Sequence, residues 1–172
     1  MRKAILYIAC SLDGYIAAPG DDLSFLDNAD ACGDMGYPEF IQTVDTVILG
    51  RRTFDWVLTK VPEWPHKEET YVITRTPRPS QGNVHFHTGG PRELVADLKT
   101  KEGGNLFIDG GGQVVQELLK GKLIDEIMLF QIPTLLGDGI RLFDGGRPQQ
   151  ELELLASKAY PCGVVMTHYR CI

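Results

Sequence analysis

One strand-like run ends in three consecutive glycines, and this feature limits the local fold of the chain more than any other. The apolar run Asn105–Ile108 is followed by Asp109 and by Gly110, Gly111 and Gly112. The next eight or so residues place apolar side chains on one helical face and polar side chains on the other. Glycines at such a junction let a ligand approach the backbone, and the free N–H groups of the helix offer an anion site. The run favours a phosphate-bearing ligand; a tight turn that needs positive φ is the alternative.

Short β-rich segments alternate with amphipathic ones along the 172 residues, a length that fits a single domain over residues 1–172. Strands are expected at Ala4–Cys10, Thr46–Leu49, Tyr71–Thr74, Val84–His87, Asn105–Ile108, Glu126–Gln131, Leu152–Lys158 and Val164–Cys171. Helices are expected at Pro38–Thr43, Arg52–Leu58, Pro91–Lys101 and Gln113–Lys120. Alternation in the middle of the chain predicts parallel strands with crossover helices, and the last two strands predict an antiparallel hairpin. The predicted fold class is α/β with a mixed, mostly parallel sheet, in which ligands bind at the carboxyl ends of the strands.

Two further strand ends carry arginine and hydroxyl side chains. Gly50 ends an apolar run and is followed by Arg51, Arg52 and Thr53, while a second β run ends in Thr74 and Arg75. Guanidinium groups match phosphate oxygens, and basic residues at a helix N-terminus oppose the macrodipole unless an anion compensates. These strand ends suit a 2′-phosphate, so NADPH is favoured over NADH; a solvated basic helix start and an ordinary polar turn are the alternatives.

Composition and charge narrow the class of protein. The formal net charge of −6 argues against a nucleic-acid partner, and the apolar stretches are too short for a membrane span. A cytoplasmic location follows by default, because the N-terminal run is interrupted too early for a signal peptide. The cysteines lack metal-ligand spacing, so no metal site is expected, and Cys10 and Cys171 are expected to be buried free thiols.

Four segments carry a resemblance to a known family. They are Ser11–Ala17, Gly50–Phe54, Ile108–Gly112, and Leu123–Glu126 running on to Pro133–Phe143. In this order they resemble the dihydrofolate-reductase-like superfamily, and more closely its riboflavin-biosynthesis reductase branch in a stand-alone form. The resemblance implies a three-layer α/β/α fold with about eight strands, NADPH as cofactor and a homodimer.

The resemblance also implies which residues hold the cofactor. Those at the phosphates and the 2′-phosphate would be Gly50, Arg51, Arg52, Thr53, Thr74 and Arg75. Those under the pyrophosphate would be Gly110, Gly111, Gly112, Gln113 and Val114, with a non-proline cis peptide bond among the glycines. Asp109 stands where riboflavin reductases commonly have Glu, so the implied reduction of 5-amino-6-(5-phosphoribosylamino)uracil is one option. Dihydrofolate reductase activity and a non-catalytic NADP(H)-binding protein are the alternatives.

The candidate catalytic residues are Asp13 and Asp109. Asp13 follows the first strand and could bind substrate or deliver a proton, although Asp-Gly is also a strong turn pair. Asp109 could act in the same way or serve the glycine turn. The aromatic residues that could wall a pocket for a small-molecule substrate, or equally belong to the core, are Tyr15, Phe25, Tyr37 and Phe40.

An irregular acidic segment between Gly20 and Tyr37 could be a lid or a solvated loop. Its acids are Asp21, Asp22, Asp27, Asp30 and Asp34.

Overall fold

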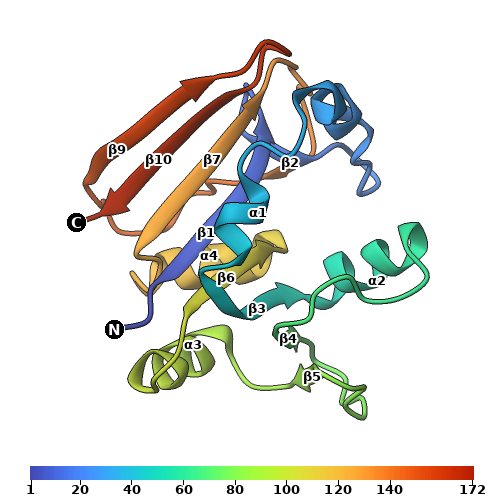
Figure 1. The fold of residues 1–172 in the computed structure, drawn as a ribbon, viewed down its shortest axis with the longest axis vertical. Helices are drawn as coiled ribbons and strands as arrows, with labels where there is room; N and C mark the ends of the chain where they lie inside the picture. Colours follow the sequence, from blue (N-terminus) through green and yellow to red (C-terminus); the bar gives the residue numbers. More distant parts are fainter.

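An eight-stranded mixed sheet forms the centre of the protein in the computed structural model (Figure 1), which describes residues 1–172 except for the side chain of Asp30. The strand order is β5-β4-β3-β6-β1-β7-β10-β9. The strands are β1 (Ala4–Ser11), β3 (Val44–Gly50), β4 (Glu69–Ile73), β5 (Val84–His87), β6 (Asn105–Gly110), β7 (Glu126–Ile132), β9 (Leu152–Ala159) and β10 (Val165–Cys171). Pairing is parallel from β5 to β7 and antiparallel along β7-β10-β9. The predicted α/β fold class with its C-terminal hairpin is confirmed.

Helices cover both faces of the sheet, which gives the three expected layers. They are α1 (Tyr37–Ile41), α2 (Arg51–Lys60), α3 (Pro91–Thr100) and α4 (Gly112–Lys120). Side chains of β1 alternate between the faces, so that Leu6 packs with α3 and α4 while Ile5 packs with α1 and α2. β3 and β6 lie in the middle of the sheet, and their apolar runs are buried on both faces because helices cover both. Every helix in the described part of the chain is too short or too polar to cross a membrane.

Two local elements differ from the expectations. A 3₁₀ helix, η1 (Ser24–Cys32), occupies the acidic segment that was expected to be irregular, and its apolar residues pack on β7. Asp30 belongs to that segment, but its side chain lies outside the described residues. A second, two-stranded sheet pairs β2 (Tyr15–Ala17) with β8 (Ile140–Arg141). It packs against the glycine turn, since a Cβ at Gly112 would lie 3.0 Å from Cγ2 of Ile140.

The cysteines fall into two groups. Cys10 and Cys171 are free as expected; Cys10 is buried and Cys171 is half-buried. Cys32 and Cys162 form a disulfide bond across 130 residues of sequence, a pairing that the sequence did not predict.

Candidate active site

The N-termini of α2 and α4 meet at the carboxyl ends of β3 and β6. Gly50 is the N-cap of α2 and Gly111 is the N-cap of α4, so neither cap side chain occupies the first amides of its helix. The two turns touch: a Cβ at Gly111 would lie 3.1 Å from the Gly50 nitrogen and 3.5 Å from Oγ1 of Thr53. Two sets of free helix N–H groups therefore face one small region, which is a favourable place for a phosphate or pyrophosphate.

The glycine turn reverses the chain with trans peptide bonds. Gly110 and Gly111 adopt φ values of 139° and 85°, in a region that side chains other than glycine rarely adopt. The expectation of a cis peptide bond among the glycines was wrong, because the structure contains no cis bond among its described residues. Gln113 is exposed beside this turn, and Val114 is buried beneath Gly50.

The arginines of α2 are paired with carboxylates of the chain. Nη1 of Arg51 lies 2.6 Å from Oδ2 of Asp55, and Arg52 forms an ion pair with Asp21. These carboxylates offset the unfavourable interaction of the two arginines with the helix macrodipole, a role that the sequence analysis gave to a bound anion. Both arginines remain exposed enough to exchange these partners for a ligand phosphate.

The end of β4 supplies one exposed cation and one structural hydroxyl. Among the described side chains Arg75 has no ion-pair partner, and it is exposed. Thr74 is buried, and its hydroxyl accepts a hydrogen bond of 3.1 Å from the Thr76 backbone N–H. Arg75 is thus available for a ligand, whereas the hydroxyl of Thr74 is used in its own turn.

Asp109 lies at an irregularity in the sheet. The pairing of β3 with β6 steps from Ile48–Ile108 to Leu49–Gly110, so Asp109 has no partner residue on β3. Such bulges re-aim side chains beside functional sites. The residue keeps partial exposure, yet desolvation raises the pKa of its carboxyl to about 6. No described residue donates a hydrogen bond to this partly exposed carboxyl, so nothing in the described part of the chain offsets its desolvation.

Tyr37 and His66 lie on the same face of the sheet as Asp109. The Tyr37 hydroxyl is 3.3 Å from Nδ1 of His66, and burial followed by the nearby Asp109 and Glu68 carboxylates raises the Tyr37 pKa to about 12. Burial also lowers the pKa of His66. A protonated phenol, which pairs with His66, therefore lies near a carboxyl whose pKa is about 6. His66 was not predicted, because it lies in a loop without periodicity and only the fold brings it to Tyr37.

Asp13 is engaged in holding the loop that follows β7. Its carboxylate accepts hydrogen bonds from the Ser11 hydroxyl at 2.6 Å, the Gly137 backbone N–H at 2.7 Å and the Leu136 backbone N–H at 3.1 Å. These bonds, led by that of Ser11, lower the Asp13 pKa to about 2. The geometry favours the turn role over proton delivery, because an acid with so low a pKa holds no proton at neutral pH.

The remaining aromatic candidates are part of the core. Tyr15, Phe25 and Phe40 are each 5–6% exposed. Phe40 stacks on Tyr7 with 4.5 Å between ring centroids. Of the four predicted pocket residues, only Tyr37 is half-buried beside Asp109, so the structure favours the core alternative for the other three.

Comparison with known proteins identifies the family. The RibD C-terminal domain family matches residues 2–166. The chain belongs to this family. It is 40% identical to the uncharacterized protein YwjB of Bacillus subtilis (strain 168), over 98% of each chain. RibD of Haemophilus influenzae, a riboflavin biosynthesis protein, is 27% identical over 84 residues, which cover 49% of this chain and 23% of RibD.

Solved structures of similar proteins share the fold. A protein of Shewanella sp. PV-4 that carries a provisional riboflavin biosynthesis name is 32% identical, with a TM-score of 0.88 and 99% of each chain covered. The Thermotoga maritima diaminohydroxyphosphoribosylaminopyrimidine deaminase/5-amino-6-(5-phosphoribosylamino)uracil reductase is 13% identical, with a TM-score of 0.73. The match covers 99% of this chain and 57% of the Thermotoga chain. The RibD family is reductase-like, so the protein is identified as a member of a reductase-like family with a dihydrofolate-reductase-like fold.

Proposed function

We propose that this family member is an NADPH-dependent reductase that transfers a hydride to a small heterocyclic or sugar-derived substrate. The observation that carries the proposal is the contact between Gly50 and Gly111, which brings two open helix N-termini together two residues after the desolvated Asp109. The turn that would bind phosphate therefore adjoins the acid that would act on the substrate.

The backbone of Gly50–Thr53 and Gly110–Val114 would hold the cofactor pyrophosphate through helix amides. Arg51 and Arg75 would contact the 2′-phosphate, for which a planar guanidinium offers paired donors. Gly50 and Gly111 fit this role because a side chain on Gly111 would collide with the neighbouring turn and fill the cradle. When bound, NADPH would supply the hydride.

Asp109 would supply the proton that balances the hydride. Its pKa of about 6 keeps a useful protonated fraction at neutral pH, and general acids work best when their pKa lies near the working pH. Tyr37, held by His66, would donate a hydrogen bond to a carbonyl or ring nitrogen of the substrate. A C=N or C=O carbon fits this chemistry, and 5-amino-6-(5-phosphoribosylamino)uracil remains a candidate because the family includes reductases of riboflavin biosynthesis.

Titration with NADPH and with NADH, followed by cofactor absorbance in the presence of candidate substrates, tests the proposal. We expect NADPH to bind more tightly and to be oxidised by at least one pyrimidine or sugar-derived substrate. Oxidation with dihydrofolate alone would favour the folate alternative. Tight NADPH binding without oxidation across a broad panel would instead favour a non-catalytic binding protein, and the absence of binding would refute the cofactor site. A cytoplasmic location stays a prediction.

A homodimer is the proposed assembly, and the outer strand of the sheet is the surface that supports it. All residues of β9 are exposed, and this strand forms the sheet edge (Figure 1). It carries Leu152 and Leu154, which are 45% and 55% exposed. Exposed apolar edge strands tend to pair with another chain, and a second copy offers the same edge. Sedimentation equilibrium should show a dimer for the wild type and for Leu135→Arg, a control at another exposed leucine, but a monomer for Leu154→Arg. A wild-type monomer would contradict this assembly.

A further inference from the structure

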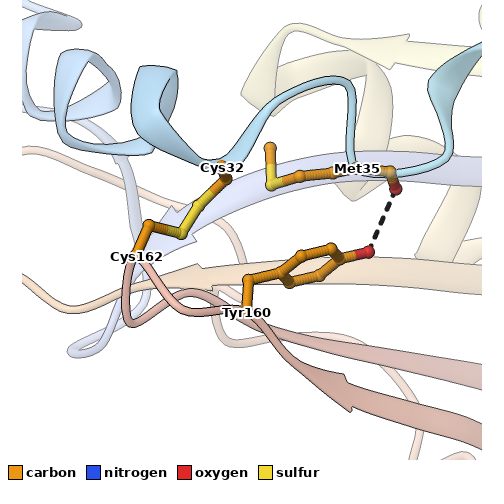
Figure 2. The surroundings of a disulfide bond; sticks show 4 residues. All are labelled: Cys32, Met35, Tyr160 and Cys162. Atoms are coloured by element: carbon orange, nitrogen blue, oxygen red, sulfur yellow. Dashed lines mark hydrogen bonds between the residues drawn. A yellow bond between two sulfur atoms is a disulfide. The ribbon is translucent and has the colours of Figure 1, made fainter.

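The Cys32–Cys162 disulfide ties together two segments that are far apart in sequence. Cys32 ends η1, and Cys162 lies in the turn between β9 and β10 (Figure 2). The Cα atoms are 5.4 Å apart, within the usual range for a disulfide. The bond therefore clamps the end of η1 onto the hairpin turn.

Both cysteines lie where a reductant can reach them. Each is half-buried, and both chain neighbours of each are exposed: Ala31 and Gly33 beside Cys32, and Pro161 and Gly163 beside Cys162. The free thiol of Cys10, by contrast, is buried, and burial raises its pKa to about 11. Accessibility is what thiol–disulfide exchange requires.

The disulfide lies shortly before Tyr37 in the sequence, and Tyr37 is the residue that lies near Asp109. Only residues 33–36 separate Cys32 from Tyr37, the first residue of α1. Three of these four residues have left-handed backbone, with φ of 70° at Gly33, 51° at Met35 and 86° at Gly36. This connection has no regular ladder of hydrogen bonds.

Few other interactions hold this connection in place. One is the hydrogen bond from the Tyr160 hydroxyl to the Met35 carbonyl, at 3.1 Å, which Figure 2 shows beside the disulfide. The other hydrogen bonds are local, within Asp34–Phe40, and the Met35 side chain packs against the core cluster that contains Phe25 and Val164. Besides this packing, the disulfide and the Tyr160 hydrogen bond are the described ties from residues 32–36 to the hairpin, and both come from the same turn.

We propose that Cys32 and Cys162 form a reversible redox site, in which breaking the bond loosens residues 33–37 and displaces Tyr37 from the Asp109 site. The partner is a dithiol, either a small molecule or a protein dithiol–disulfide oxidoreductase. Its thiolate attacks one sulfur and forms a mixed disulfide, and its second thiolate then releases the protein. Two electrons and two protons pass to Cys32 and Cys162, and the dithiol becomes a disulfide. Glutathione disulfide, or a protein disulfide, reverses the reaction and is reduced.

The first test uses the full chain and needs no substrate. The protein is equilibrated with glutathione disulfide or with dithiothreitol, alkylated in denaturant and weighed by mass spectrometry, and its amide hydrogen exchange is measured in parallel. Because the chain has four cysteines and one disulfide, we expect two alkylated cysteines in the oxidised protein and four in the reduced protein. Amides of residues 33–37 should exchange at least tenfold faster after reduction.

Three variants give the matched controls. Cys32→Ser and Cys162→Ser should show the fast exchange under both conditions, whereas Cys171→Ser, which removes a half-buried free thiol, should keep the response of the wild type. If a Ser variant fails to fold, the wild type under the two conditions still decides the matter. Four alkylated cysteines with glutathione disulfide, or equal exchange rates in both states, would overturn the proposal.

The effect on Tyr37 as a substrate contact rests on the proposed function. Turnover measurements on the same variants distinguish a failure of the redox site from a failure of the proposed function. If turnover of NADPH changes at least threefold with redox state in the wild type and in Cys171→Ser but not in the other variants, both ideas are supported. If exchange responds while no variant or wild type oxidises NADPH, the proposed function fails and the redox site stands. If turnover is present but independent of redox state, the displacement of Tyr37 is refuted.

Discussion

Replacement of Asp109 with Asn measures directly how strongly the site desolvates its carboxyl. The pKa of this group rises from the ordinary value of 3.8 to about 6 in the folded protein. The folded protein therefore binds the proton more tightly than the unfolded chain does, and the free energy of unfolding falls as the pH rises from about 4 to about 6. A difference of about 2 pKa units corresponds to about 3 kcal/mol.

Asparagine has nearly the same shape and carries no charge at any of these pH values. We therefore expect Asp109→Asn to have about the same stability as the wild type near pH 4 and to be about 3 kcal/mol more stable at pH 8. Urea unfolding at both pH values, followed by circular dichroism, is the assay. With a slope of about 2 kcal/mol per M, the midpoint of the variant should exceed that of the wild type by roughly 1.5 M at pH 8.

The control is Glu102→Gln, which removes one negative charge at an exposed position. It should shift the midpoint by less than about 0.3 M at either pH, since surface substitutions usually change stability by no more than about 0.5 kcal/mol. A difference between Asp109→Asn and the wild type that is the same at pH 4 and pH 8 would refute the reasoning. In that case the carboxyl would be solvated in the folded protein, and Asp109 would no longer be a candidate proton donor.

Three further changes test the cofactor site and the loop beside it. Replacing Arg51 and Arg75 with Ala should weaken NADPH binding about tenfold or more and NADH binding less than about threefold, because a charge-assisted hydrogen bond contributes about 1.5–3 kcal/mol. Fluorescence titrations measure both affinities, and equal losses for the two cofactors would contradict the 2′-phosphate assignment. Gly111→Ala should abolish NADPH binding and lower the melting temperature. The left-handed backbone at this position alone costs an alanine about 1–2 kcal/mol, and the new Cβ would lie 3.1 Å from the Gly50 nitrogen. Binding at wild-type affinity would show that the glycine turn does not hold the pyrophosphate. Asp13→Asn should melt at a lower temperature than the wild type at pH 7. This difference in melting temperature should close as the pH falls from about 4 toward 2, because the wild-type carboxyl, with its lowered pKa of about 2, then becomes protonated. A difference that is independent of pH would exclude the carboxylate as the cause.

Local pattern was sufficient for the main elements because their signals are contained in short segments. The apolar runs of β3 and β6, the helices that follow them and the C-terminal hairpin all lie where the sequence predicted them. The small sheet of β2 and β8 was missed, since strands of three and two residues give no periodic signal and pair across more than 120 residues. The disulfide was missed for the same reason, because no spacing rule links Cys32 to Cys162.

The candidate site was predictable where it is made of backbone and less so where it is made of side chains. The strand ends at Gly50 and at the triple glycine were expected to serve one ligand because ligands bind at the carboxyl edge of such a sheet, and the structure places Gly50 and Gly111 in contact. Tyr15, Phe25 and Phe40 have the composition of a pocket wall but lie in the core. His66 has no local signal, and its place beside Tyr37 depends on how the loop before β4 returns to the sheet.

The sequence by itself determined the order of strands and helices, the glycine turn and the arginines at strand ends, because each follows from backbone preferences and periodicity within a few residues. Only the tertiary structure decided how the pKa values of the two candidate acids differ. Asp13 follows β1 and Asp109 lies near the end of β6, yet the Ser11 hydroxyl and then the backbone N–H groups of Gly137 and Leu136 lower the pKa of Asp13, while burial raises that of Asp109. Desolvation and hydrogen bonding depend on what the fold brings around a side chain, and that information lies in segments far away along the chain.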